Sequence, residues 1–368
     1  MRILHVYKDY FPVLGGIENY IKILSEAHAA AGHHVIVAVC NPGPFTSIEE
    51  LNGVKVIKSG RLTTIASMPL SFGHPVAVAR LKPDVIHVHS PYPLGEVSAW
   101  LFKSRTPLVI THHSDVVRQQ SWLRLYAPLL RRVLKHAKRI LPTSPRYVET
   151  SPWLAPVKEK CTIVPLGVDH RRFVPAAQPF NGPPTLLFVG RLRYYKGLDT
   201  LLHALPDLPG VHFNVVGSGP MQAEWQKLAE TLGVTERVHF LGEVPDADLA
   251  AQYHRAHIFV LPSNARSEAF GAVLLEAMAS GLPCVSTELG TGTSWVVQDG
   301  VTGCVTPAQD SAAMAAAIHD MLADPERLTA MGTAARARVE AEFTLERLIT
   351  RVLSVYEEVI AVNENRAR

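Results

Sequence analysis

Short runs of apolar residues recur along this chain, and between most of them apolar residues return every three or four positions. The short runs are typical of buried parallel strands, and the three- and four-residue spacing is typical of helices packed against a sheet. In residues 17–31, for example, Ile21, Leu24 and Ala27 lie on one helical face, and Gly32 follows where the helix should end. The predicted strands are residues 3–7, 35–39, 54–57, 85–88 and 108–111, followed by residues 185–189, 211–216, 238–241, 258–261 and 284–286.

The predicted strands form two series, separated by the proline- and glycine-rich residues 165–184. Because strands and helices alternate on both sides of this segment, we expect an α/β protein of two facing, doubly wound Rossmann-like domains. Such sheets bind ligands at the carboxyl ends of their strands, so we expect an active site in the cleft between the domains. The predicted domains are residues 1–177 and 178–345, followed by a C-terminal helix and polar tail over residues 346–368.

Composition and charge narrow the function classes. Hydrophobic residues make up 47% and charged residues 19% of the 368 positions, which is the balance of a folded globular protein. The formal net charge of +3 is too small to attract nucleic acid through bulk charge, and we expect no nucleic-acid partner. The four cysteines lack C-x-x-C spacing, which argues against a zinc ribbon or a disulfide framework and fits a reducing cytoplasm. Without a signal-peptide pattern or a long apolar run, the protein is expected to be cytoplasmic and not to span a membrane.

Residues 267–281 give the strongest indication of chemistry, because a loop containing Glu268 runs through Gly271 into a predicted helix. The first N–H groups of a helix lack intrahelical partners and attract anions, so this helix start is a candidate diphosphate site. Glu268 precedes the helix and Glu276 lies inside it, where both carboxylates could accept hydrogen bonds from sugar or ribose hydroxyls. The alternative is structural, with Glu268 stabilising the helix dipole and Glu276 solvated on the helix surface.

A second candidate site follows the predicted strand at residues 185–189. Gly190 permits a tight turn of the backbone, and Arg191 and Lys196 place two cations near the carboxyl end of the strand. Such cations suit a diphosphate leaving group, since each well-placed donor is worth about 3–4 kcal/mol when charge develops. The alternative is a basic loop exposed to solvent.

Two glycine turns and a histidine give weaker signals. Gly15 and Gly16 follow the first predicted strand, and Gly217 and Gly219 follow a later one. Neither turn has the full G-x-G-x-x-G pattern, but both could line a nucleotide pocket. We interpret His113 as a contact for a sugar hydroxyl or a phosphate, with a hydrogen-bonded structural histidine as the alternative. Because no H-E-x-x-H or comparable spacing occurs, we expect no metal.

Residues 122–140 interleave apolar and basic side chains, with Arg131 and Arg132 as the centre of a basic cluster. Such a segment could lie on an anionic membrane surface, and its binding would then be sensitive to salt. An ordinary amphipathic surface helix is the alternative. Pro128 is expected to divide the segment into two helices.

Taken together, these residues resemble the retaining glycosyltransferases of family 4, which have the GT-B fold of two facing Rossmann-like domains. The resemblance covers nearly the whole chain. Its most specific parts are the E-x7-E pattern formed by Glu268 and Glu276 and the G-R-x-x-x-x-K-G pattern of residues 190–197.

The resemblance implies a role for each candidate residue. Arg191 and Lys196 would bind the donor diphosphate, Glu276 the ribose, and Glu268 the hydroxyls of the transferred sugar. His113 matches the family's histidine after the fifth N-terminal strand, and His113, Glu268, Arg191 and Lys196 are the predicted catalytic residues. We expect Lys196→Ala and Glu268→Ala to abolish transfer without disturbing the fold. The predicted donor-binding residues also include Gly15, Gly16, Gly190, Gly217, Gly219, Phe270, Gly271, Ala272, Val273 and Leu274.

The resemblance also implies an activity. The N-terminal domain would bind the acceptor and the C-terminal domain a nucleotide-diphosphate sugar, which is a co-substrate, so that no cofactor is required. A hexose would be transferred with retention and without a metal, the departing diphosphate helping to deprotonate the acceptor. Residues 111–120 and 290–303 look like bacterial O-antigen or exopolysaccharide enzymes. This favours GDP-mannose as donor, a lipid-linked or saccharide acceptor in surface-polysaccharide synthesis, and a peripheral position on the inner face of the cell membrane. The alternatives are a UDP-sugar-dependent transferase, a GT-B epimerase, and a noncatalytic sugar-nucleotide-binding protein.

Overall fold

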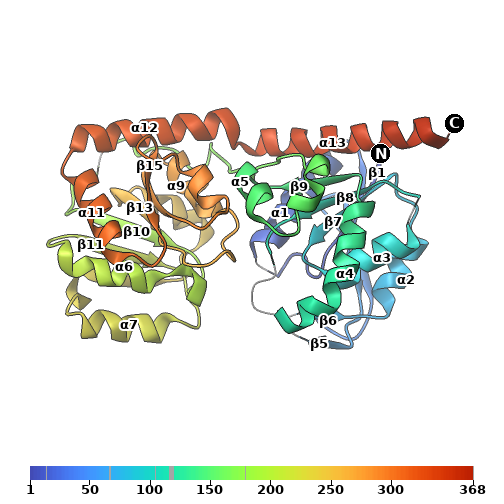
Figure 1. Cartoon of the computed structure of the whole chain (residues 1–368), viewed down its shortest axis with the longest axis horizontal. Helices are drawn as coiled ribbons and strands as arrows, with labels where there is room; N and C mark the ends of the chain where they lie inside the picture. Colours follow the sequence, from blue (N-terminus) through green and yellow to red (C-terminus); the bar gives the residue numbers. More distant parts are fainter. Residues whose placement is uncertain (14, 66–67, 104, 116–119, 179, 368) are drawn as a thin grey trace. The chain divides into compact units, whose positions relative to one another are not determined.

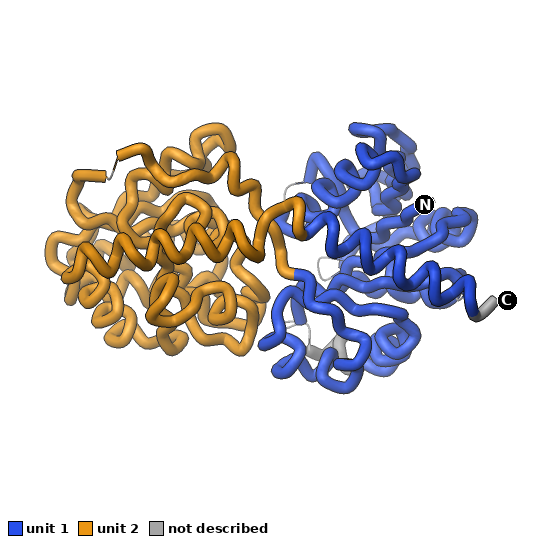
Figure 2. The backbone as a smooth tube through the Cα atoms, turned by 90° about the horizontal axis from the view of Figure 1, so that it is seen from above, with its two compact units in different colours: residues 1–164, 348–368 blue, residues 165–347 orange. Residues whose placement is uncertain are grey.

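The computed structural model describes residues 1–368 except 14, 66–67, 104, 116–119, 179 and 368, and it describes no side chains for residues 120–125, 366 and 367. The chain divides into two compact units (Figure 2). Unit 1 comprises Met1–Val164 and Leu348–Arg368, and unit 2 comprises Pro165–Arg347. Each unit is built on its own sheet of mainly parallel strands, which confirms the predicted fold class.

Unit 1 contains a seven-stranded sheet in the order β3-β4-β2-β1-β7-β8-β9. Figure 1 labels β1, β7, β8 and β9 of this sheet. All neighbouring strands in it are parallel except β3 and β4. The chain order reverses beside β1, with β2 on one side and β7 on the other, and this switch point is where doubly wound sheets bind ligands. The strands are β1 Arg2–Val6, β2 His34–Cys40, β3 Ser47–Leu51, β4 Val54–Ser59, β7 Val85–Ser90, β8 Leu108–His112 and β9 Arg139–Pro142, and the hairpin strands are β5 Thr63–Ile65 and β6 Met68–Leu70. The helices are α1 Gly16–Ala30, α2 Gly73–Arg80, α3 Pro93–Phe102, α4 Gln120–His136 and α5 Pro145–Thr150.

Unit 2 contains a six-stranded, fully parallel sheet in the order β12-β11-β10-β13-β14-β15. Its switch point lies between β10 and β13; both strands are buried, and Thr185 at the start of β10 is their only polar residue. The strands are β10 Thr185–Val189, β11 His212–Val216, β12 Val238–Gly242, β13 Ile258–Leu261, β14 Cys284–Glu288 and β15 Gly303–Pro307. The helices are α6 Leu198–Ala204, α7 Gln222–Thr231, α8 Leu249–Tyr253, α9 Ala272–Ala279, α10 Thr293–Val296, α11 Ser311–Leu322 and α12 Pro325–Glu342.

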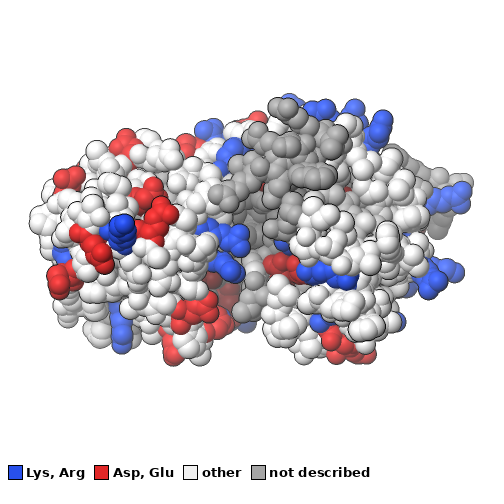
Figure 3. Space-filling model, turned by 90° about the horizontal axis from the view of Figure 1, so that it is seen from below, with Lys and Arg blue, Asp and Glu red and all other residues white. Residues whose placement is uncertain are grey.

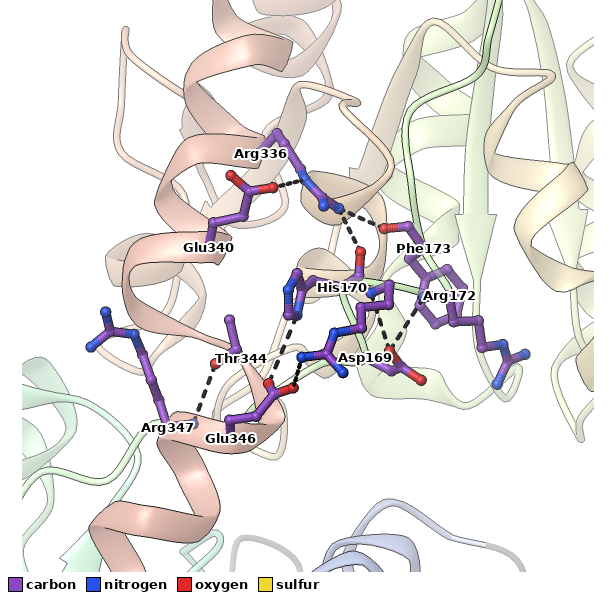
Figure 4. A network of polar contacts seen from close by, with 10 residues as sticks. Asp169, His170, Arg172, Phe173, Arg336, Glu340, Thr344, Glu346 and Arg347 are labelled. Atoms are coloured by element: carbon purple, nitrogen blue, oxygen red, sulfur yellow. Dashed lines mark hydrogen bonds and ion pairs between the residues drawn. The ribbon is translucent and has the colours of Figure 1, made fainter.

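The division between the units lies before Pro165, earlier than the predicted boundary after residue 177. The reason is a set of polar contacts that attaches the segment after Pro165, including residues 169–173, to α12 (Figure 4). The Arg336 guanidinium donates hydrogen bonds to the carbonyls of His170 at 2.8 Å and Phe173 at 2.7 Å. Because these bonds involve backbone atoms, no residue type in the sequence marks the segment as part of unit 2.

The C-terminal helix α13, Leu345–Ala367, is longer than predicted, and from Leu348 onward it belongs to unit 1. Its Tyr356 is fully buried, and the phenol oxygen lies 2.5 Å from Nδ1 of His87 on β7. The predicted C-terminal helix is therefore present, and most of it is part of unit 1. An apolar-polar repeat identifies a helix but does not reveal which surface it covers.

Two further predictions are corrected in unit 1. Helix α4 continues across Pro128, whereas two helices were predicted. Strands β3 and β9 were not predicted, because β3 is an exposed antiparallel strand of sequence SIEEL and β9 has only four residues, RILP. In unit 2, β15 was missed because its sequence GCVTP begins with glycine and ends with proline.

The surface is consistent with the small net charge. On the face drawn in Figure 3, acidic and basic residues are interspersed over the described surface. Among the described residues, no helix combines the length and the apolar composition needed to cross a bilayer.

Candidate active site

The first part of the candidate site lies at the carboxyl end of β10. The backbone turns at Gly190, whose φ of 153° is unfavourable for other residues, and its N–H donates to the carbonyl of Val216 at 3.0 Å. Arg191 follows and is exposed, and within the described part of the chain its guanidinium forms no ion pair. Lys196 ends a short 3-10 turn and is 9% exposed. One cation of the predicted pair is therefore open to solvent and the other is buried.

The second part follows β13, the neighbour of β10 across the switch point of the sheet. The loop after β13 folds back so that the Glu268 carboxylate lies within 2.6 Å of the Lys196 ammonium. Ser263 donates to the same oxygen, Oε2, at 3.4 Å, and Thr291 donates to the Glu268 carbonyl at 2.8 Å. The structure thus brings together two residues that are far apart in the sequence, at the position where such sheets bind ligands.

Both side chains of this ion pair are only 11% exposed. Burial is the largest single influence on Lys196 and disfavours its charge, but the attraction of Glu268 and Tyr195 and the hydrogen bond to Glu268 together outweigh it and raise the pKa of the ammonium above its usual value. A buried ion pair is weak evidence for stability, because desolvation offsets much of the Coulomb attraction. Two such charges at a ligand site are more readily explained by a charged substrate than by stability.

Glu276 lies inside α9, Ala272–Ala279, and is partly buried. Its Oε2 accepts a hydrogen bond of 2.7 Å from the phenol of Tyr253 at the end of α8. Burial raises the pKa of Glu276, although this hydrogen bond and the charge of Arg172 oppose the change. Burial, together with the adjacent carboxylate, keeps the pKa of Tyr253 well above its usual value, so the phenol remains protonated and donates.

The two glutamates share one feature. In both, the hydrogen bonds from described residues go to Oε2, and Oε1 is not among the enclosed polar atoms that lack a partner. Each carboxylate is therefore held by the protein at one oxygen and can present the other to a ligand hydroxyl.

The start of α9 is shaped by Gly271, whose φ of 78° lies in the left-handed region. A Cβ at this position would lie 2.7 Å from Leu261 and 2.9 Å from Leu274, so glycine is required by both conformation and packing. The N–H groups of Ala272 and Val273 lie in the first turn, where no intrahelical acceptor is available. The N–H of Leu274 donates to the Gly271 carbonyl at 2.8 Å, so a donor contact from Leu274 would compete with this bond.

Gly217 and Gly219 pack directly against the turn after β10. A Cβ on Gly217 would lie 2.1 Å from the carbonyl oxygen of Gly190, and one on Gly219 would lie 2.4 Å from that of Leu192. This close approach gives both glycines a structural reason, independent of nucleotide binding. Whether Gly217 and Gly219 also contact the donor is not tested by this packing, and that contact stays a prediction.

Three predicted site residues lie in unit 1. Gly15 is the N-cap of α1, and a Cβ there would collide with the Glu18 carboxylate at 2.1 Å. A Cβ on Gly16 would meet no atom within 4 Å, so packing does not explain this glycine. His113 directly follows β8 and is 8% exposed, and its Nε2 lies 3.1 Å from Nδ1 of His89.

The structure places several side chains of the candidate site in positions that the sequence did not predict. The Phe270 side chain is buried, with its ring centroid 6.4 Å from that of Trp295, so a donor contact from Phe270 would have to involve its backbone. Tyr253 and Ser263 support the two glutamates, but they belong to no motif and the sequence gives no signal for them. In the predicted membrane segment, Arg131 and Arg132 are exposed on α4, while residues 122–125 lie outside the described side chains.

A potential metal cluster also appears, which the sequence did not predict. Nitrogens of the buried residues His5, His87 and His89 lie within 4.8 Å of one another. Nδ1 of His87 lies 2.5 Å from Tyr356 and its Nε2 lies 2.6 Å from Thr111, so metal binding there would disrupt existing hydrogen bonds.

Comparisons with known proteins identify the family of the chain. Residues 14–172 match the model of Glycosyltransferase Family 4, and residues 170–338 match that of Glycosyl transferases group 1. The chain is 38% identical to the D-rhamnosyltransferase WbpZ of Pseudomonas aeruginosa, with 94% of this chain and 92% of the relative covered. It is 35% identical to the O-antigen chain mannosyltransferase C of Escherichia coli, with 97% and 98% covered.

Solved structures share the fold. A sucrose-phosphate synthase from Thermosynechococcus elongatus matches with a TM-score of 0.81 at 25% identity, covering 98% of this chain and 99% of that one. HepE from Anabaena, in complex with UDP, matches with a TM-score of 0.75 at 20% identity, covering 97% of this chain and 100% of that one.

Proposed function

This chain is a glycosyltransferase of the group 1 family with the GT-B fold, and we propose that it transfers mannose, or a related sugar of the same configuration, from a nucleotide-diphosphate donor. The observation that carries the proposal is the buried Lys196–Glu268 pair, 2.6 Å apart at the switch point of unit 2. Exposed Arg191 and the start of α9 belong to the same unit and supply further groups that suit an anion.

In the proposed complex, Arg191, Lys196 and the first N–H groups of α9 hold the diphosphate. Glu276 accepts from the ribose through Oε1, while Tyr253 holds Oε2. Glu268 accepts from hydroxyls of the transferred sugar through its own Oε1. In unit 1, the backbone at Gly16 and the His113 side chain contact the reacting groups.

The proposed reaction follows the retaining pathway that the family resemblance implies. The bond between C1 of the sugar and the phosphate oxygen breaks, and the diphosphate leaves with the electron pair. The acceptor hydroxyl oxygen bonds to C1 from the same face, and its proton passes to the leaving phosphate oxygen. The cations at β10 stabilise the charge that develops on the diphosphate, so the scheme requires no metal and no cofactor.

The donor sugar is inferred from the relatives. One is a D-rhamnosyltransferase and another an O-antigen mannosyltransferase, and D-rhamnose is the 6-deoxy form of D-mannose. GDP-mannose is therefore the first donor to test, and a saccharide on a lipid carrier of O-antigen synthesis is the first acceptor. A UDP-hexose is the second candidate donor, since HepE was crystallised with UDP and with UDP-glucose.

A thermal-shift screen of GDP-, UDP- and ADP-sugars tests the donor assignment. A ligand present at 100 times its Kd stabilises the native state by about 2.7 kcal/mol, which should raise Tm by several degrees. We expect the largest shift with GDP-mannose, and the same shift in EDTA as in magnesium. If none of these nucleotide sugars shifts Tm and none is turned over with a lipid-linked saccharide, the proposed activity is wrong.

We also infer a peripheral association with anionic membranes through α4. Leu130, Val133 and Leu134 pack in the core, while Arg131, Arg132 and Lys135 are exposed on the helix. A cavity of about 500 Å³ next to the end of α4 is lined by further basic residues, among them Lys138 and Lys160. We expect sedimentation with phosphatidylglycerol vesicles at low salt and its loss at high salt; binding that is indifferent to salt or lipid charge would contradict this inference.

A further inference from the structure

Three buried imidazoles form a hydrogen-bonded line across the sheet of unit 1. Nε2 of His113 lies 3.1 Å from Nδ1 of His89, and Nε2 of His89 lies 3.0 Å from Nδ1 of His5. His5 is on β1 and pairs in register with His87, so His89 lies two residues further along β7 on the same face of the sheet. The line leads from the interior of the sheet to the candidate substrate contact at His113.

All three rings are neutral at physiological pH. Burial lowers the pKa of His5 and of His113 to about 3 and takes that of His89 well below its usual value. A neutral imidazole has one donor and one acceptor nitrogen. His89 contacts His5 through Nε2 and His113 through Nδ1, so it donates to one neighbour and accepts from the other. The hydrogen bonds therefore all point the same way along the line, and all three rings are the same tautomer.

The inner end of the line selects the direction. Nε2 of His5 is buried and has no hydrogen-bond partner among the described residues. The nearby His28 cannot supply an acceptor bond, because its Nε2 faces the Ile349 carbonyl at 3.5 Å and its Nδ1 is itself unpartnered. A buried N–H without an acceptor is rarer in proteins than an acceptor without a donor. Nε2 of His5 therefore carries the lone pair, and Nδ1 of His5 carries the hydrogen.

From this end the hydrogens can be followed outward. Nδ1–H of His5 donates to Nε2 of His89, and Nδ1–H of His89 donates to Nε2 of His113. The remaining hydrogen of His113 then lies on Nδ1, which is not among the enclosed polar atoms that lack a partner. The Tyr20 ring, edge-on to His113 with centroids 5.0 Å apart, helps to fix the orientation of the imidazole.

We propose that His89, supported by His5, is a positioning residue that holds His113 in the Nδ1–H tautomer, so that His113 donates a hydrogen bond to a substrate oxygen and does not act as a base. The inference rests on the proposed function only in assuming that a substrate oxygen approaches His113. That oxygen belongs to a sugar hydroxyl or a phosphate, and comparing the bound free nucleotide diphosphate with the bound nucleotide sugar distinguishes the two.

The tautomer can be measured directly in the full-length protein labelled with ¹⁵N-histidine. Long-range ¹H–¹⁵N correlation spectra distinguish a protonated ring nitrogen from an unprotonated one, and His113→Ala assigns the signals of His113. We expect Nδ1 of His113 to be protonated and Nε2 to be unprotonated, with the same pattern in His5 and His89. Protonation of His113 at Nε2, or different tautomers among the three rings, would overturn the proposal. A change in the His5 and His89 signals on addition of zinc would also overturn the proposal, because it would identify the cluster of His5, His87 and His89 as a metal site.

Variants connect the tautomer to the reaction. His89→Leu removes the donor to His113, and kcat/KM should fall about tenfold, the effect of losing one hydrogen bond. His89→Asn keeps an N–H in this region and should retain both the tautomer and most of the activity. His74→Asn is a control of matched burial, because His74 is fully buried in unit 1 and lies outside the line.

The outcomes separate this inference from the proposed function. If folded His89→Leu keeps the wild-type tautomer and activity, His89 does not position His113 and the inference fails. If His113→Ala transfers sugar at the wild-type rate, the substrate contact assigned to His113 fails, and the inference fails with it, whereas donor binding by unit 2 is unaffected.

Discussion

Replacing Lys196 by methionine should affect the protein twice, once in stability and once in activity. The change leaves the Glu268 carboxylate, whose side chain is 11% exposed, without the ammonium that lies 2.6 Å away. Breaking a buried ion pair on one side costs about 3–5 kcal/mol, because the remaining charge is uncompensated. For a unit of this size such a loss lowers Tm by roughly 10 °C. The sequence led us to expect an undisturbed fold for changes at Lys196 and Glu268, and the burial of both residues corrects this expectation.

The double variant Lys196→Met/Glu268→Gln separates the two effects. It removes both charges, so its free energy of unfolding should return to within about 1 kcal/mol of the wild type. Transfer should nevertheless be lost in Lys196→Met, in Glu268→Gln and in the double variant. Urea unfolding without donor measures stability, and transfer from GDP-mannose measures activity. Lys22→Met is the control, since it breaks a more exposed ion pair of similar length, 2.8 Å, and should cost less than about 1 kcal/mol.

Two results would refute this reasoning. If Lys196→Met unfolds at the same urea concentration as the wild type, the ion pair is not buried as the structure has it. If the restabilised double variant transfers sugar at the wild-type rate, the pair has no role in the reaction and the proposed donor site is wrong.

Three further predictions concern other parts of the molecule. Tyr253→Phe removes the bond to Oε2 of Glu276 and should weaken donor affinity about three- to tenfold in calorimetry; unchanged affinity would mean that Tyr253 does not position the glutamate. Burial lowers the folded pKa of His5 and of His113 in unit 1 to about 3, below the unfolded value of 6.5, so the unfolded chain binds more protons as the pH falls. The free energy of unfolding should therefore decrease as the pH falls from 6.5 towards the folded pKa values near 3. The decrease is up to about 1.4 kcal/mol per pH unit for each histidine. Urea titrations that give the same stability at pH 7 and pH 5 would contradict this. Gly16→Ala should leave the unfolding midpoint nearly unchanged but reduce kcat. Gly15→Ala should destabilise the protein, because the new Cβ would collide with the Glu18 carboxylate. Equal effects of the two variants on stability would contradict this packing.

Much of the fold could be predicted because buried parallel strands are continuous apolar runs. All ten predicted strands are present, and each boundary agrees within two residues. Strands β3, β9 and β15 escaped prediction because an edge strand, a four-residue strand and a strand bounded by glycine and proline lack this pattern. The three-residue hairpin strands β5 and β6 were also missed, because they are too short to form an apolar run. The unit boundary and the docking of α13 depend on long-range contacts, among them those of Arg336 and Tyr356, which leave no local signal.

The candidate site was predictable only in part. Glu268, Glu276, Arg191 and Lys196 could be found because their spacing matches a family pattern, and the switch point of the sheet explains why Lys196 and Glu268 meet. The burial of Lys196 and Glu268, and the hydrogen bonds that hold one oxygen of each glutamate, could not be predicted. The supporting side chains come from segments without a motif, and their contacts arise only when the sheet is assembled.

In the proposed donor site the cation at Arg191 helps to bind the diphosphate of a nucleotide sugar, and calorimetric titration of Arg191→Gln measures this contribution without disturbing the buried Lys196–Glu268 pair. Arg191 is exposed and forms no ion pair within the described chain, so its replacement should not alter stability. Arg193→Gln, an equally exposed change two residues along the same loop, is the matched control. With the nucleotide sugar that stabilises the wild type most, we predict a roughly 10- to 100-fold loss of affinity in Arg191→Gln and wild-type affinity in Arg193→Gln. Equal affinities in the wild type and Arg191→Gln would contradict the proposed donor site.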